Sequence, residues 1–203
     1  MLAQVILSQQ RGQVGPSFLQ FPSASPRYPE RVKLIEASSF VGNGLLGNPA
    51  GVCILKAEPE SDAMQATAAE VGHAETAFLW PEGDGWRLRW FTPEVEVDLC
   101  GHATLAAAWV LSREVRAHGR VKFHTRSGVL TADLLDSGEV RLDFPALIPV
   151  ESSLPEILSE AAALAVWTGQ SRDDWFAALS SAREVREFCP DMERIGRVGK
   201  RGL

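Results

Sequence analysis

The chain has 203 residues, 45% hydrophobic and 23% charged, as expected for a globular protein of one or two domains. Its formal net charge of −6 argues against a nucleic-acid surface, because phosphate binding needs clustered Lys and Arg. No apolar run approaches the roughly 18 residues of a membrane helix, and the N-terminus lacks the pattern of a signal peptide. Three scattered cysteines fit neither a disulfide framework nor a zinc knuckle. We therefore expect a cytoplasmic protein that binds neither nucleic acid nor membrane.

The first third of the chain predicts an extension followed by strands and one helix. Residues 1–31 carry Pro16, Pro22, Pro26 and Pro29 without a stable period, so we expect an extension that is mobile or partly ordered against the surface. Strands are predicted over 32–37, 51–56, 73–80 and 86–91, with a turn-rich loop over 42–49. A helix is predicted over 62–71, ended by Gly72.

A second helix, predicted over 101–112, is apolar on almost every side. Such a helix must be buried. Its first backbone N–H groups have no partner within the helix, and its N-terminus attracts anions. Because His102 stands at this helix start, the sequence predicts a functional site there.

The remaining residues continue the same pattern. Strands are predicted over 121–125, 128–134 and 138–144, and Pro145 and Pro149 mark a possible domain change. A helix over 154–165, strands over 175–179 and 183–188, and a short helix capped by Asp191 follow. The whole is an α+β pattern, mostly antiparallel, packed around one buried helix.

Three side chains could carry chemistry. Glu75 heads an apolar strand, where lost hydration suits a carboxyl to proton transfer near neutral pH; the alternative is a solvated glutamate at a strand end. His102 is expected to be neutral at a helix N-terminus, and the alternative is a histidine that caps its own helix. Cys100 is either a thiolate, since a helix N-terminus lowers a thiol pKa, or an inert buried cysteine. No metal-ligand spacing such as HxxxH or HExxH is present, so no metal site is predicted.

Several segments together resemble the phenazine-biosynthesis PhzF-like family, which belongs to the diaminopimelate-epimerase-like superfamily. The matching segments follow one another through residues 33–145 with the family's order and spacing. They are Gly47-Asn48-Pro49-Ala50-Gly51-Val52-Cys53, Met64-Gln65 with Ala69-Glu70, Glu75-Thr76-Ala77-Phe78, Arg87 to Glu94, Cys100-Gly101-His102-Ala103-Thr104-Leu105, and Thr125 with Ser127-Gly128. Residues 146–203 fit the family only loosely, and Ser38 stands where the family carries an Asp.

The resemblance implies a diaminopimelate-epimerase-like fold, in which each of two similar domains wraps a sheet around a central helix. It implies that residues 32–145 form the first domain and that residues 146–203 form part of a second domain. Family chains continue to a second helix start that carries an acidic motif, so the second domain is expected to be incomplete. The resemblance implies that Glu75 and His102 are the catalytic residues. It also implies that the substrate-binding residues are Asn48, Gly101, Ala103 and Thr104. The family uses neither a metal nor an organic cofactor, and we expect a homodimer acting on a small molecule.

Three functions remain open at the level of sequence. The first is a cofactor-independent isomerase that moves a proton on a small carboxylate-bearing metabolite, with an activity that the expected lack of half a domain would impair. The second is an inactive fragment that acts as a binding or oligomerisation module, because an unfinished sheet exposes edges and apolar surface. The third is an epimerase or racemase in which Cys100 is the base.

Overall fold

A computed structural model describes residues 17–19, 32–41 and 46–203. The chain divides into two compact units, Met1–Phe144 and Pro145–Leu203, which are described separately below. The extension predicted for residues 1–31 lies outside the described residues, except for Ser17–Leu19, which forms a strand. None of the helices in the described part of the chain has the length and hydropathy that a bilayer crossing requires.

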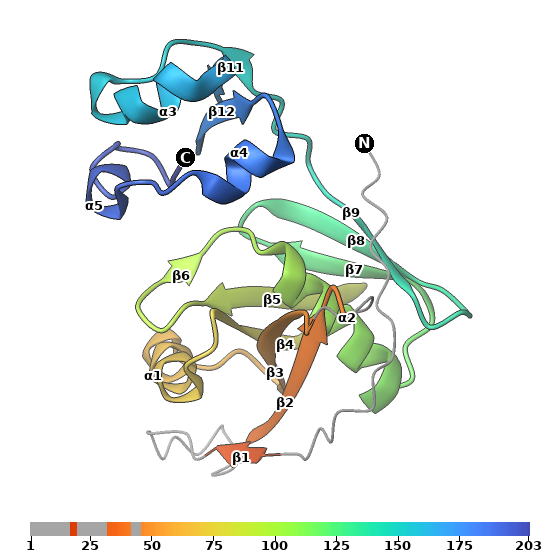
Figure 1. Cartoon of the computed structure of the whole chain (residues 1–203). Helices are drawn as coiled ribbons and strands as arrows, with labels where there is room; N and C mark the ends of the chain where they lie inside the picture. The colour runs from red at the N-terminus through yellow and green to blue at the C-terminus, as the bar shows by residue number, and fades with distance from the viewer. Residues whose placement is uncertain (1–16, 20–31, 42–45) are drawn as a thin grey trace. The chain divides into compact units, whose positions relative to one another are not determined.

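In its described residues the first unit contains one mixed sheet and two helices (Figure 1). Its elements are β1 (Ser17–Leu19), β2 (Val32–Ser39), β3 (Asn48–Ile54), α1 (Ser61–Val71), β4 (Glu75–Glu82), β5 (Gly85–Phe91), β6 (Glu96–Val97), α2 (Gly101–Glu114), β7 (Gly119–Thr125), β8 (Gly128–Leu134) and β9 (Val140–Asp143). The sheet order is β1-β2-β3-β4-β5-β7-β8-β9, with β6 paired to β5. The pairs β3–β4 and β5–β7 are parallel, and all the others are antiparallel. A parallel pair needs a crossover, and α1 and α2 lie in these two crossovers.

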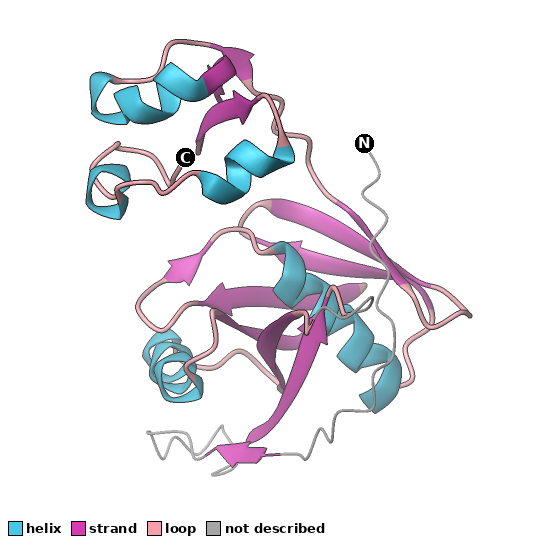
Figure 2. Ribbon diagram, viewed as in Figure 1, coloured by secondary structure: helices cyan, strands magenta, loops and turns pink. Residues whose placement is uncertain are grey.

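The sheet curls around α2, as Figure 2 shows. Eight of the 14 residues of α2 are buried, and their neighbours in the main core come from β2, β3, β4, β5, β7, β8 and β9. Ala106, Ala107 and Ala108 are all at most 1% exposed, and their small side chains let strands approach the helix on several sides. The prediction of a buried central helix is therefore confirmed, and α2 continues to Glu114 rather than ending near residue 112.

The other face of the sheet carries a second core, formed with α1. Successive side chains of a strand point to opposite faces. In β4, Ala77 and Leu79 accordingly join the core around α2, while Phe78 and Trp80 join the core around α1. Both faces of this strand are covered, which explains its run of buried residues. Glu75 is the first residue of β4, directly before that run, so the buried strand fixes its backbone.

The second unit is smaller and more open. It contains β10 (Val150–Glu151), the 3-10 helix η1 (Glu156–Leu158), α3 (Ser159–Leu164), β11 (Ala165–Gln170), β12 (Trp175–Leu179), α4 (Ala182–Glu187) and α5 (Met192–Ile195). Its three strands form an antiparallel sheet in the order β10-β11-β12. Leu158 and Ala161 are its only buried hydrophobic residues, counted over 145–203, all of which are described. A cavity of about 450 Å³ lies among Trp175, Phe176, Val185, Phe188 and other mostly apolar side chains.

Two predictions in this unit are corrected by the structure. The strand predicted over 183–188 is wrong, because these residues belong to helix α4 and its C-cap. The side chain of Ser181 accepts a hydrogen bond from the N–H of Glu184, which caps the helix start. The helix predicted over 154–165 is shorter, divided between η1 and α3, and strand β11 begins at Ala165.

Candidate active site

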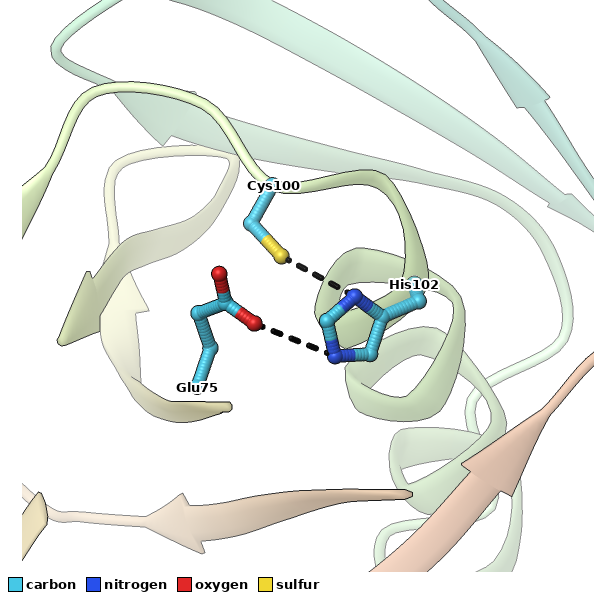
Figure 3. Close-up of side chains that lie close together, drawn as sticks. All are labelled: Glu75, Cys100 and His102. Atoms are coloured by element: carbon cyan, nitrogen blue, oxygen red, sulfur yellow. Dashed lines mark hydrogen bonds and ion pairs between the residues drawn. The ribbon is translucent and has the colours of Figure 1, made fainter. Parts of the chain in front are cut away.

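The start of β4 and the start of α2 bring three candidate functional side chains together (Figure 3). Glu75 Oε2 lies 3.3 Å from Nε2 of His102. The Sγ atom of Cys100 lies 3.4 Å from Nδ1 of the same ring. The imidazole is thus placed between a carboxyl group and a thiol, each facing a different ring nitrogen.

Buried hydrogen bonds hold the helix start in place. Ser39, the last residue of β2, is fully buried and donates from Oγ to the carbonyl oxygen of His102 at 2.7 Å. Thr104, also fully buried, donates from Oγ1 to the carbonyl oxygen of Cys100 at 2.5 Å. These bonds tie the backbone on both sides of Gly101 to the packed core. The position of the imidazole is therefore set by the fold.

The facing atoms of Glu75 and His102 lack hydrogen-bond partners. The two side chains are 21% and 10% exposed, respectively. Although 3.3 Å separates Oε2 from Nε2, the pair does not have hydrogen-bond geometry, and both atoms are buried without another partner. Buried polar atoms are almost always hydrogen-bonded, so an unpartnered pair of this kind calls for a functional explanation. A bound ligand with a polar group would supply the missing partners.

The surroundings determine the charge of the ring and of the thiol. Burial lowers the pKa of His102, although the Glu75 carboxylate and the Pro49 carbonyl oxygen act in the opposite direction. The ring is therefore neutral at pH 7. Burial raises the pKa of Cys100 to about 12, and Glu75 adds to this effect. The N–H groups of Ala103 and His102 lower the thiol pKa by less than burial raises it.

The predicted alternative of a Cys100 thiolate is thus not supported by its environment. The predicted influence of the helix N-terminus is present, but desolvation outweighs it. For His102 the predicted neutral state agrees with the direction of the pKa shift, and its main cause is burial.

The predicted substrate-binding residues occupy different environments. Gly101 is exposed, and a Cβ at this position would meet no atom within 4 Å, so space is open beside the helix start. Asn48 is exposed at the start of β3 and pairs with Ser39. Ala103 and Thr104 are fully buried. The Ala103 N–H acts on the Cys100 sulfur, and the Thr104 hydroxyl is already used within its own helix.

Ser39 was not among the predicted site residues. Its role depends on the packing of β2 beside α2, 63 residues later in the chain, and no local motif signals that contact.

Glu75, Cys100 and His102 also form the one group in the described part of the chain that offers three potential metal-ligand atoms within 4.8 Å of one another. The sequence contains no signal for this group, because Glu75 is 25 residues from Cys100. Among these three groups, Sγ of Cys100 and Nδ1 of His102 are the pair in hydrogen-bond geometry.

Comparison with known proteins identifies the family. Residues 37–203 match the PhzC-PhzF family, described as phenazine biosynthesis-like proteins. A protein named an uncharacterized isomerase from Halalkalibacterium halodurans is 37% identical over 170 residues, covering 81% of this chain and 63% of the relative. Another of that description, from Pseudomonas aeruginosa, is 42% identical over 170 residues, covering 83% of this chain and 65% of the relative. The chain thus spans slightly less than two thirds of the length of these relatives.

Solved structures support the same assignment. The crystal structure of a PhzF-family phenazine biosynthesis protein from Enterococcus faecalis is similar with a TM-score of 0.70 at 33% identity, covering 82% of this chain and 64% of that one. A PhzC/PhzF protein from Clostridium difficile gives a TM-score of 0.68 at 34% identity, covering 81% of this chain and 63% of that one. The predicted diaminopimelate-epimerase-like α+β fold is confirmed. The chain belongs to the PhzC-PhzF family of phenazine biosynthesis-like proteins.

Proposed function

We propose that this protein is a cofactor-independent isomerase that moves a proton on a small carboxylate-bearing molecule, with Glu75 as the proton carrier. The observation that supports this most directly is the buried, unpartnered pair of Glu75 Oε2 and His102 Nε2 at the start of α2. A carboxylate can accept a proton, and a neutral imidazole can donate a hydrogen bond beside it. The isomerase names of the relatives support the same reaction class.

The proposed reaction has two proton transfers. Ionised Glu75 takes a proton from a substrate carbon next to an electron-withdrawing group, and the C–H bonding electrons delocalise into that group as an enolate-like anion. A C=C bond of the substrate next to this carbon shares the negative charge. Protonated Glu75 then returns the proton to the far carbon of that C=C bond, and the double bond shifts by one position. No oxidant or added group is required.

The start of α2 is suited to stabilising the negative charge. Backbone N–H groups in the first turn of a helix lack intrahelical partners and favour anions. The open space beside Gly101 gives a ligand access to them. The imidazole of His102 adds a donor that carries no charge of its own. Hydrogen-bond donors aimed at developing charge are a large source of rate enhancement in enzymes.

The chemistry of Cys100 favours Glu75 over a cysteine base. A thiol whose pKa is raised to about 12 is almost entirely protonated at pH 7 and cannot act as an efficient base. All three cysteines are free, which is consistent with a reducing compartment such as the cytoplasm.

Deuterium exchange tests the role of Glu75. A panel of small unsaturated carboxylic acids is incubated with the protein in D₂O, and incorporation at carbon is followed by proton NMR and mass spectrometry. We expect exchange for at least one member, and a loss of about 10³-fold in Glu75→Gln, the range typical of a general base. Glu70→Gln changes an exposed glutamate of α1 and is expected to retain full exchange. Exchange that persists in Glu75→Gln rules out the assignment.

A second candidate function rests on the openness of the second unit. Its apolar cavity and its exposed Val166 and Val185 are suited to burial against a partner, including a second copy of the chain. In that case the protein is an oligomerisation module without activity. Analytical ultracentrifugation over a hundredfold concentration range, together with the exchange assay, distinguishes the enzyme from the oligomerisation module. A homodimer with exchange activity supports the enzyme, and a concentration-dependent oligomer without exchange supports the module.

A further inference from the structure

The two ring nitrogens of His102 have chemically different neighbours, and this difference bears on where the ring holds its proton. Nδ1 faces the thiol of Cys100 at 3.4 Å, within the range of a sulfur hydrogen bond. Nε2 faces the Glu75 carboxyl group at 3.3 Å. Figure 3 shows the ring between these two groups. A neutral imidazole has one N–H donor and one acceptor nitrogen, so only one of two tautomers can satisfy both neighbours.

Both neighbours favour the same tautomer. An ionised carboxylate accepts hydrogen bonds and donates none, so Glu75 favours a proton on Nε2. Cys100 is 7% exposed and retains its S–H at neutral pH. Sulfur is a weak acceptor, whereas an unprotonated imidazole nitrogen is a good one. Of the two acceptors near the thiol, Nδ1 of His102 and the Glu75 carboxylate, Nδ1 is the one in hydrogen-bond geometry, and we assign the S–H to it.

The N–H groups of His102 and Ala103 act on the sulfur and lower the thiol pKa, which still leaves its S–H to donate elsewhere. Cys100 is the N-cap residue of α2, with an extended backbone at φ −144° and ψ 119°, yet its side chain makes no capping hydrogen bond. Ser, Thr, Asp and Asn are the usual residues at this position because their side chains cap the helix. A cysteine here forgoes that stabilisation, and its S–H is directed to the ring instead.

We propose that Cys100 is a positioning residue whose S–H donates to Nδ1 of His102 and holds the imidazole as the Nε2–H tautomer, with Nε2 facing Glu75 and its N–H left to the substrate. The proposal rests on the proton-transfer function assigned to Glu75. It explains how the cysteine contributes without ever becoming a thiolate. The Nε2–H, which has no hydrogen-bond partner within the protein, is then available to the substrate anion when Glu75 takes the substrate proton.

The tautomer can be observed without a substrate. The full-length protein labelled with ¹⁵N gives separate imidazole nitrogen signals for each of its four histidines, and the loss of one set in His102→Gln assigns that residue. At pH 7 we expect a protonated-type shift at Nε2 and an unprotonated-type shift at Nδ1. In Cys100→Ala both shifts move toward the average of the two tautomers. This variant removes the S–H, while the hydrogen bonds from Ser39 and Thr104 that hold the helix start do not involve the thiol.

Cys53→Ala is the matched control. Cys53 is a fully buried thiol whose pKa burial also raises to about 12, but it lies in the core around α1. Its removal tests the general effect of losing a buried sulfur, and the His102 shifts should not change. The proposal is overturned if wild-type His102 carries its proton on Nδ1, or if Cys100→Ala leaves both nitrogen shifts unchanged while the amide spectrum remains folded.

Exchange kinetics separate this proposal from the function on which it rests. We expect Cys100→Ala to slow deuterium exchange about tenfold, the equivalent of one ordinary hydrogen bond. Complete loss of exchange in Cys100→Ala would make the cysteine a base and overturn its positioning role. If Glu75→Gln retains exchange while the Nε2–H tautomer is observed, the proposed function fails and the placement of the proton stands. If Glu75→Gln abolishes exchange while the proton lies on Nδ1, only the inference about Cys100 fails.

Discussion

At the scale of single residues, burial determines what the site can do. His102 and Cys100 are both kept uncharged by desolvation, while Glu75 retains a side chain that is 21% exposed. Two neutral groups and one carboxyl group fit a site with a single proton carrier. Because the His102 ring is neutral, it donates a hydrogen bond to an anion without giving up its proton.

The neutral state of His102 predicts a pH dependence of stability. Burial lowers the folded-state pKa of this ring below its value in the unfolded chain, about 6.5. As the pH falls through that value, the unfolded state binds the proton first, so the free energy of unfolding decreases until the folded-state pKa is passed. The titratable groups facing the ring are Glu75 and Cys100.

Urea unfolding at pH 7 and pH 5 measures this effect. We expect His102→Gln to lose less stability between the two pH values than the wild type, because its side chain does not titrate. His118→Gln alters an exposed histidine and should follow the wild type. Identical pH dependence in all three proteins would mean that His102 is protonated equally easily in the folded and unfolded states.

The site was only partly predictable from residue types. Glu75 and His102 could be singled out because an acid before an apolar run and a histidine at a buried helix start are both locally visible. The state of Cys100 was not predictable, since the helix terminus and burial shift its pKa in opposite directions and only the packed structure shows which is larger. Ser39 carries no local signal, because its partner is the backbone of a distant helix.

At the scale of elements, the contact between the end of β2 and the start of α2 orients the site. Ser39→Ala removes the hydroxyl that donates to the His102 carbonyl oxygen in a fully buried position. We expect a loss of about 1 kcal/mol in the free energy of unfolding, together with slower exchange, because a buried acceptor loses its partner. Chemical denaturation and the deuterium assay measure the two effects.

Ser38→Ala provides the control on the same strand, because this neighbouring serine is exposed. Its unfolding free energy should stay within about 0.5 kcal/mol of the wild type. Equal losses in the two variants would mean that the hydrogen bond to His102 contributes nothing specific.

Elements with a strong local signal were predictable, and the others were not. Helix α2 and strand β8 have continuous patterns that begin at a glycine, and both form where the sequence predicts them. The error over 183–188 came from favouring a strand over a capping pattern. Ser181 and Glu184 have the spacing of a capping box, which is a helix-start signal. Strand β11 was missed because the apolar helix before it continues into the strand without a breaker.

At the scale of the whole molecule, the two units differ in how much apolar surface they bury. The first unit has two cores, each on one face of the same sheet, whereas the second unit buries only Leu158 and Ala161 among its hydrophobic residues. Local stability follows the density of buried contacts. The two units should therefore open independently and at different free energies.

Hydrogen-exchange mass spectrometry on the intact chain tests this difference. We expect amides of α2 and β4 to exchange most slowly, and amides of β10, β11 and β12 to exchange at least about tenfold faster. Uniform protection of both units would show that residues 145–203 are as stable as the first unit and would remove the basis for the oligomerisation alternative.

The wrapping of α2 by the sheet has a consequence for how the chain is synthesised. The helix ends at residue 114, but the strands that cover it extend as far as Asp143. For about 30 residues of translation, a helix that is apolar on almost every side has been made without its complete cover, while β7, β8 and β9 are still being made. At typical elongation rates this interval lasts a few seconds. The nascent chain is thus a substrate for chaperones that bind apolar segments, and codons that slow translation between residues 115 and 143 should lower the yield of folded protein.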